Sequence, residues 1–166
     1  MKKSRIWLAL LLIVGVVVLI LATTSVQWLM ASRPSGTSTP LPPGSIPISL
    51  NGEFMGAFTP TFLDSLPTAQ FTDVYEEKPQ DGWLLKDVIL RVVPALQLDP
   101  QAAIVVTSSS RDKSAQLTWA EVMDPANYVM FDLSNRGTLK LVSVLPALDG
   151  RNEWVQDVDR IEITTR

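Results

Sequence analysis

The chain contains no cysteine and no histidine among its 166 residues, and these two absences exclude more chemistry than any motif adds. Without cysteine it can form no disulfide, no thiolate metal site and no acylated lipoprotein anchor. Without histidine it has no Ser-His-Asp triad, no HExxH zinc site and no imidazole acid–base group. Any catalysis would have to rest on carboxylates, Lys, Tyr, Ser or a bound cofactor. The composition therefore favours a protein that is not an enzyme.

Positive charge is also scarce beyond the N-terminal region. Four of the 14 basic residues precede residue 34, whereas all 17 acidic residues follow it. The remainder of the chain therefore carries 10 basic and 17 acidic residues, and no basic stripe is visible along it. Proteins that bind nucleic acid or anionic lipid usually show such a stripe, so we expect no nucleic-acid partner. The acidic balance is most simply a feature that favours solubility.

A basic cluster at residues 2–5 precedes a long apolar run, residues 6–31. About 20 helical residues suffice to cross the hydrocarbon core of a membrane. The run therefore predicts a single-pass signal anchor in the cell membrane, with residues 1–5 in the cytoplasm and the C-terminal domain outside it. A cleaved secretory signal is the alternative, although its apolar region would be shorter and followed by a better Ala-x-Ala site. Either way, the remainder lies outside the cytoplasm.

The composition changes sharply after the apolar run. Residues 32–46 are rich in Pro, Ser, Thr and Gly, which predicts an extended, semi-rigid stalk. Residues 47–166 have the size of one ordinary domain with a single core. We therefore expect a membrane-tethered domain that the stalk holds away from the bilayer.

Within that domain, short strand patterns alternate with short helical ones. Asn51-Gly52 is a strong hairpin signal between two of the strands. Strands are expected at residues 46–50, 53–58, 69–76, 102–108, 114–117, 128–133, 138–144 and 160–165. Helices are expected at residues 59–66, 83–93 and 119–123, the second opened by a turn at Asp81-Gly82 and the third by a Thr118/Glu121 capping box. This order predicts a strand-dominated α+β domain with short helices.

The order of these elements is similar to that of a known family. The sequence GWLLKDVI resembles the family's G-x-P-L-x-x-L-L helix, and WVQDVDRI resembles its terminal W-V-x-x-V-x-x-I. Four further segments match its strands and turns in the same order: residues 104–112, 116–122, 128–132 and 137–146. Together these segments resemble the oxidoreductase molybdopterin-binding domain, which has the sulfite-oxidase fold, over about residues 47–165. The resemblance implies that fold for the exported domain.

The resemblance also implies a pterin cofactor and redox chemistry, but a key residue is missing. Catalytic members of the family hold molybdenum through a cysteine, and this chain has none. No functional residue of the family can be carried over, so we expect a non-catalytic binding or interaction module without a cofactor. The alternative is a molybdopterin-dependent redox domain, or its electron-transfer partner, that takes its remaining metal ligands from elsewhere.

One turn carries the candidate site residues. Ser108, Ser109, Ser110, Arg111 and Lys113 can form a small anion-binding nest with backbone N–H groups. The matching turn borders the cofactor in the family that the chain resembles. An ordinary polar turn explains the same residues. If the turn does bind a partner, we expect a small anionic ligand; the other expected partner of the domain is another protein.

Overall fold

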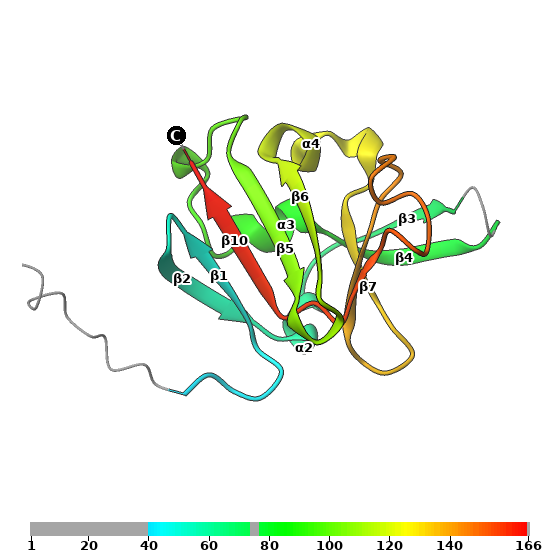
Figure 1. Cartoon of the computed structure of the whole chain (residues 1–166), viewed down its shortest axis with the longest axis horizontal. Coiled ribbons are helices and arrows are strands. Elements are labelled where there is room, and N and C mark those ends of the chain that lie inside the picture. Colours follow the sequence, from blue (N-terminus) through cyan, green and yellow to red (C-terminus); the bar gives the residue numbers. More distant parts are fainter. Residues whose placement is uncertain (1–39, 74–76, 166) are drawn as a thin grey trace, which may run out of the picture. The chain divides into compact units, whose positions relative to one another are not determined.

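The computed structural model describes residues 40–73 and 77–165, which form two five-stranded sheets (Figure 1). The first has the order β2-β1-β10-β5-β6, formed by Glu53–Phe58, Ile46–Leu50, Arg160–Thr164, Ala103–Ser108 and Lys113–Thr118. The second has the order β3-β4-β7-β8-β9, formed by Thr68–Thr72, Pro79–Leu84, Met130–Leu133, Leu139–Val142 and Val155–Gln156. Strands β1 and β10 pair in parallel, and their other neighbours pair antiparallel. The strand-dominated α+β class is confirmed.

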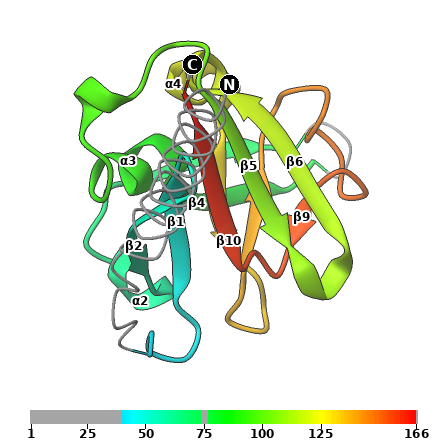
Figure 2. The same cartoon turned by 60° about the vertical axis from the view of Figure 1, so that its left-hand side comes forward.

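One large cluster of buried side chains includes residues of both sheets and of three α-helices in the described ranges, α2 (Pro60–Leu63), α3 (Leu85–Leu90) and α4 (Trp119–Met123). Buried and exposed side chains alternate along β10. Ile161 and Ile163 are buried in this core, and the residues on either side of each are exposed. Figure 1 shows α3 behind β5 and β10, and α3 contributes Leu85, Val88 and Ile89 to the same core. Figure 2 shows the first sheet from a second direction. The described part of the chain also contains three 3₁₀ helices: η1 (Ala95–Gln97), η2 (Ser109–Arg111) and η3 (Pro125–Asn127).

A second, smaller hydrophobic cluster lies on the opposite face of the second sheet. Successive strand residues point to opposite faces, so Phe131 enters the main core while Met130 and Asp132 face the other way. Met130 packs there with Phe71, Val142 and Trp154. Both faces of the second sheet are therefore partly covered.

Two local predictions are confirmed in detail. Asn51 and Gly52 both have positive φ angles, 52° and 80°, as the tightest hairpin turn requires. The strands on either side have the predicted bounds. At the start of α4, Glu121 N donates to Thr118 Oγ1 over 3.2 Å, and Thr118 N donates to Glu121 Oε2 over 2.7 Å. This is the reciprocal capping box.

The predicted turn at Asp81-Gly82 is wrong, and the helix predicted at residues 83–93 is present but shorter. These residues begin in strand β4, and the helix covers only Leu85–Leu90. Gly82 pairs with Asp132 in β7, and a Cβ atom on Gly82 would lie 1.9 Å from the Phe131 carbonyl oxygen. The glycine therefore allows the backbones of β4 and β7 to approach closely. An Asp-Gly pair in the sequence does not show whether the glycine serves this purpose or forms a turn.

Other predicted elements have the right type but different bounds. Helix α2 ends at Leu63 instead of residue 66, and strand β3 ends at Thr72. Tyr128 has a φ of 45° at the end of η3, so strand β7 begins only at Met130. Strand β8 is shorter than predicted, and the two-residue strand β9 was not expected. These elements are shorter than predicted because turns interrupt them, and the pattern of apolar residues does not specify the backbone angles of those turns.

The predicted tail, anchor and most of the stalk, residues 1–39, lie outside the described residues. Across the ranges that the structure describes, no helix has the length and apolarity needed to span a membrane. Strand β1 begins at Ile46, one residue before the predicted start of the domain, and the Ile46 side chain is buried.

Candidate anion-binding site

The turn that carries the predicted site residues joins β5 to β6 through η2. Ser109 donates to Asp159 from its backbone N over 2.7 Å and from its hydroxyl over 3.2 Å. Arg111 Nε donates to Asp157 Oδ2 over 2.7 Å, and Lys113 Nζ donates to the carbonyl oxygen of Asn152. The structure therefore brings the predicted donors together, and each of these three residues contacts an oxygen atom of the protein itself.

Ser108 and Ser110 occupy the same turn. Their hydroxyl oxygens lie 3.4 Å apart, and Ser108 is fully buried at the end of β5. Ser110 is exposed on η2. The two hydroxyls thus interact with each other at the base of the turn.

Asp157 is the acceptor that joins this turn to the turn between β7 and β8. It accepts from Thr138 Oγ1 over 2.6 Å, from Arg111 Nε, and from Arg136 Nη2, which lies 3.1 Å from each carboxylate oxygen. The hydroxyl of Thr138, followed by the Arg111 guanidinium, lowers the pKa of the Asp157 carboxyl below its ordinary value. Asp157 also has a positive φ of 57°, so its backbone conformation is one that few non-glycine residues adopt.

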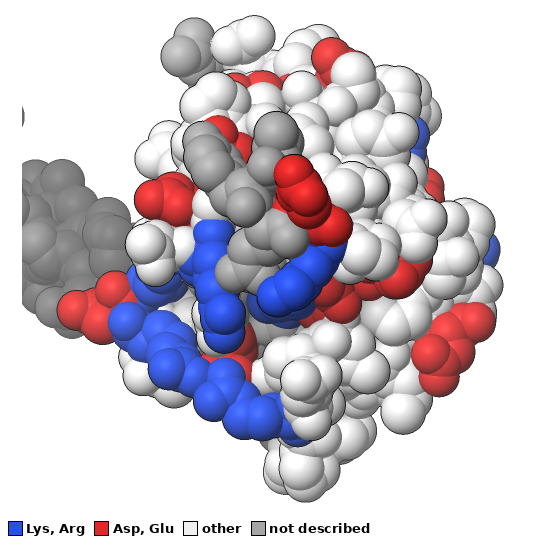
Figure 3. Space-filling view, turned by 90° about the vertical axis from the view of Figure 1, so that its right-hand side faces the viewer, with Lys and Arg blue, Asp and Glu red and all other residues white. Residues whose placement is uncertain are grey.

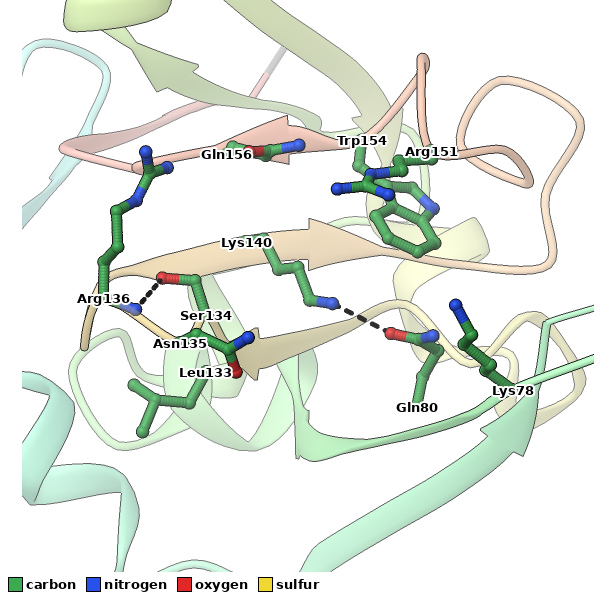
Figure 4. Close-up of a pocket in the computed structure, with 10 residues that line it drawn as sticks. All are labelled: Lys78, Gln80, Leu133, Ser134, Asn135, Arg136, Lys140, Arg151, Trp154 and Gln156. Atoms are coloured by element: carbon green, nitrogen blue, oxygen red, sulfur yellow. Dashed lines mark hydrogen bonds between the residues drawn. The ribbon is translucent and has the colours of Figure 1, made fainter. Parts of the chain in front are cut away.

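A second group of basic residues lines a pocket of about 450 Å³ on the outer face of the second sheet (Figure 4). Among the residues that the structure describes, its lining contains four Lys or Arg and no Asp or Glu: Lys78, Gln80, Leu133, Ser134, Asn135, Arg136, Lys140, Arg151, Trp154 and Gln156. The volume is within the range of pockets that hold small molecules. Figure 3 shows blue Lys and Arg side chains gathered on this side of the molecule. The domain is net acidic, yet this pocket is lined by basic side chains, with acidic side chains beside them (Figure 3).

Sheet register explains why residues distant in sequence meet here. Lys140 in β8 lies opposite Asp132 in β7 and opposite Gln156 in β9. These three side chains therefore form one row across three strands on the outer face. Arg136 comes from the turn before β8, while Lys78 and Arg151 come from the segments before β4 and β9. Four separate segments of the chain thus supply the four cations.

Lys140 is held inside the wall of the pocket. Its Nζ atom lies 2.8 Å from Asp132 Oδ2 and 2.9 Å from Gln80 Oε1, and 4.6 Å from the ring centroid of Trp154. The side chain is only 17% exposed. An ammonium group has three N–H donors. The two acceptor oxygens and the cation–π contact with the Trp154 ring therefore provide one partner for each N–H of Lys140.

Arg136 differs from Lys140 because its guanidinium is 57% exposed. Both of its contacts with Asp157 use the Nη2 atom. A guanidinium carries five N–H donors in a planar fork. Within the described part of the chain, Nε and Nη1 of Arg136 therefore remain available for an oxyanion that enters the pocket.

Trp154 links the pocket to the second hydrophobic cluster. Its side chain is 5% exposed and packs on Met130 and Val142, yet it also lines the pocket. Figure 4 shows the indole among Arg151, Lys140 and Lys78. The buried Nε1–H of Trp154 has no acceptor among the described residues.

The residues present do not fit a molybdenum centre. Molybdenum in the family that the chain resembles needs a soft sulfur donor, whereas the turn at residues 108–113 offers hydroxyl, guanidinium and ammonium groups. In the described ranges, no three acidic side chains are grouped so that they could hold a metal ion.

Sequence patterns did not indicate the pocket, because its cations are separated by turns and strands. The one available signal was Lys140, a lone charged residue within an otherwise apolar strand, LKLV. A charge at the centre of such a strand needs a partner, and here that partner is Asp132. No protein-family model matches the chain, and no curated protein matches it.

Proposed function

We propose that the chain is a membrane-anchored binding module without catalytic activity, which takes an anionic ligand in the basic pocket of its extracytoplasmic domain. One observation carries this proposal: four cations from separate segments converge on a single pocket in a domain that is net acidic. A concave surface lined by one sign of charge attracts ligands of the opposite charge. The polar lining and the pocket volume suit a small organic anion better than an apolar ligand.

The sulfite-oxidase-like fold remains part of the proposal. It is supported by the order of segments in the sequence and by the strand-dominated architecture. The absence of cysteine and histidine from the whole sequence supports a binding role over redox chemistry. Elemental analysis of protein purified from its native host tests this point, and about one equivalent of molybdenum would overturn the non-catalytic role.

The membrane anchor rests on the apolar run at residues 6–31 and the basic cluster before it. We expect the full chain to stay in the membrane fraction after washes with high salt and carbonate. A soluble protein whose mature N-terminus lies near residue 25 or 32 would instead establish a cleaved secretory signal.

Titration calorimetry of the full chain in non-ionic detergent tests the ligand site. Citrate at constant ionic strength is a suitable probe because it carries several carboxylates and no aromatic group. We expect saturable binding that weakens at least about tenfold in the double variant Arg136→Ala/Arg151→Ala, since each lost charge-assisted hydrogen bond contributes about 1.5–3 kcal/mol.

The matched control replaces two arginines outside the pocket, Arg91→Ala/Arg160→Ala. It removes the same net charge, so it measures the nonspecific effect of charge on citrate binding. Equal weakening in both double variants would contradict a localised site.

A further inference from the structure

The outer face of the first sheet is the side that points away from the main core. Successive strand residues point to opposite faces, so this face consists of the residues between the buried ones, such as Ser49, Val105 and Glu162. Figure 1 shows α3 behind β5 and β10, on the side of the core. Among the outward-facing residues of the five described strands, only Arg160 and Glu162 are charged.

Arg160 and Glu162 lie two residues apart on β10, the central strand of the sheet. Arg160 Nε lies 3.5 Å from Glu162 Oε1, and the two side chains are 47% and 50% exposed. The centre of this face is therefore open to solvent within the described part of the chain. An ion pair this exposed contributes little to stability. A guanidinium has five N–H donors and a carboxylate accepts at two oxygens, so each group can keep this internal contact and gain a second one.

The charge of the domain favours this face for contact with a second copy of the chain. Beyond residue 33 the chain carries 10 basic and 17 acidic residues, so two copies repel each other overall. The outer face of the first sheet carries one charge of each sign and is neutral. The cation of Arg160 lies at one position of β10, and the anion of Glu162 lies two positions further along. Such a face is complementary to itself when it is turned around.

A two-fold axis between two such faces, level with Ile161 and perpendicular to β10, produces this complementarity. Rotation about the axis makes the β10 strands of the two copies antiparallel, and it places Arg160 of each copy opposite the partner's Glu162. An axis parallel to β10 would instead place Arg160 opposite the partner's Arg160, and like charges repel. The charge pattern therefore selects the antiparallel arrangement.

We propose that the domain binds a second copy of the chain through the outer face of the first sheet, with the two β10 strands antiparallel. Arg160 of each copy contacts the partner's Glu162, so four charges of alternating sign meet at the centre. Ser49 and Val105 lie on either side of Glu162, and Thr107 lies beside Arg160. These compact side chains allow two sheets to approach to the usual separation of about 10 Å. The basic pocket shares no residue with this face, so self-association does not depend on ligand binding.

Sedimentation equilibrium of the purified full chain in a density-matched non-ionic detergent measures the dissociation constant of the dimer. Arg160→Glu places four acidic side chains at the centre of the interface, and Glu162→Arg places four basic ones there. We expect each reversal to weaken self-association at least about tenfold, because like charges are juxtaposed. The double reversal Arg160→Glu/Glu162→Arg restores the alternation of charge and should restore the dissociation constant.

A mixture of the two single variants gives the sharpest test. One variant is acidic at both positions and the other is basic at both, so an equimolar mixture should form heterodimers although each variant alone associates weakly. Arg91→Glu is the matched control, because it changes the net charge as Arg160→Glu does but lies at the end of α3. It should leave the dimer nearly unchanged. Thermal unfolding checks that each variant folds, and Arg160→Gln, which removes a charge without adding repulsion, should weaken the dimer by a smaller factor.

The possible results separate clearly. An unmodified chain that stays monomeric over the measured concentrations would overturn this interface, and so would a dimer that neither reversal weakens. If the mixture and the double reversal both fail to associate while the variants are folded, the contact between Arg160 and the partner's Glu162 is refuted. Citrate binding should be unchanged in every variant, so loss of the dimer alone would leave the proposed function standing.

Discussion

The Nζ atom of Lys140 lies 4.6 Å from the centre of the Trp154 ring, and this contact joins the outer hydrophobic cluster to the basic pocket. The same ammonium group is paired with Asp132 at 2.8 Å. Lys140 therefore fixes the indole on one side and neutralises a mostly buried carboxylate on the other. Lys140 therefore forms part of the wall of the pocket, whereas the guanidinium of Arg136 is more exposed.

Replacing Lys140 by methionine should destabilise the domain by about 2 kcal/mol, because Asp132 is left mostly buried without its cation. Urea unfolding followed by circular dichroism measures this loss. The double variant Lys140→Met/Asp132→Asn should recover part of it, since the uncompensated charge is then removed. Equal stability of the single and double variants would show that the pair does not stabilise the fold.

Replacing Asp157 by asparagine should cost about 1–3 kcal/mol, because the carboxylate accepts from Thr138, Arg111 and Arg136. Urea unfolding again provides the measurement. Asp112→Asn is the matched control, because Asp112 lies at an exposed turn with a φ of 50° that asparagine tolerates. A loss of stability in the control as large as that in Asp157→Asn would refute a specific role for the Asp157 contacts.

The lowered pKa of Asp157 predicts how stability changes with pH. The carboxyl binds its proton more weakly in the folded state than in the unfolded state, whose pKa is about 3.9. Its contribution is therefore complete above the unfolded pKa and is lost as the pH falls through the folded value. The stability difference between the unmodified chain and Asp157→Asn should shrink across this range. Unfolding midpoints measured between about pH 6 and pH 2 test this, and a difference that stays constant with pH would contradict it.

Replacing Gly82 by alanine should cost about 3 kcal/mol, because the new Cβ would lie 1.9 Å from the Phe131 carbonyl oxygen in a paired strand. Gly56→Ala is the control, since its Cβ would meet only the Val92 side chain, at 2.8 Å. A side-chain terminus can move, whereas the backbone of a neighbouring strand cannot move without loss of pairing. Thermal unfolding should rank Gly82→Ala well below Gly56→Ala, and the reverse order would refute the explanation given for Gly82.

Local interactions made part of the fold predictable. The Asn51-Gly52 hairpin and the Thr118/Glu121 capping box depend on residues only a few positions apart, and both are present as predicted. Gly82 was misinterpreted because its role depends on Phe131, which is distant in sequence and adjacent only across the sheet. Short-range patterns carry no information about such an approach.

The sites show the same limit. The donors of the turn at residues 108–113 are neighbours in sequence, but its acceptors Asp157 and Asp159 lie 46 and 50 positions away from Arg111 and Ser109. The basic pocket depends on the register of β7, β8 and β9, which places Asp132, Lys140 and Gln156 in one row. That register is a property of the assembled sheet.

Nuclear magnetic resonance of the ¹⁵N-labelled chain during a citrate titration tests the central claim most directly. The indole resonance of Trp154 is identified by its loss in Trp154→Phe. We predict that this resonance and the Nε–H of Arg136 shift together and saturably, while the indole of Trp83, which also lacks an acceptor among the described residues, remains unchanged. Shifts confined to Ser109, Arg111 and Lys113, with Trp154 unmoved, would contradict the pocket and place anion binding at the β5–β6 turn.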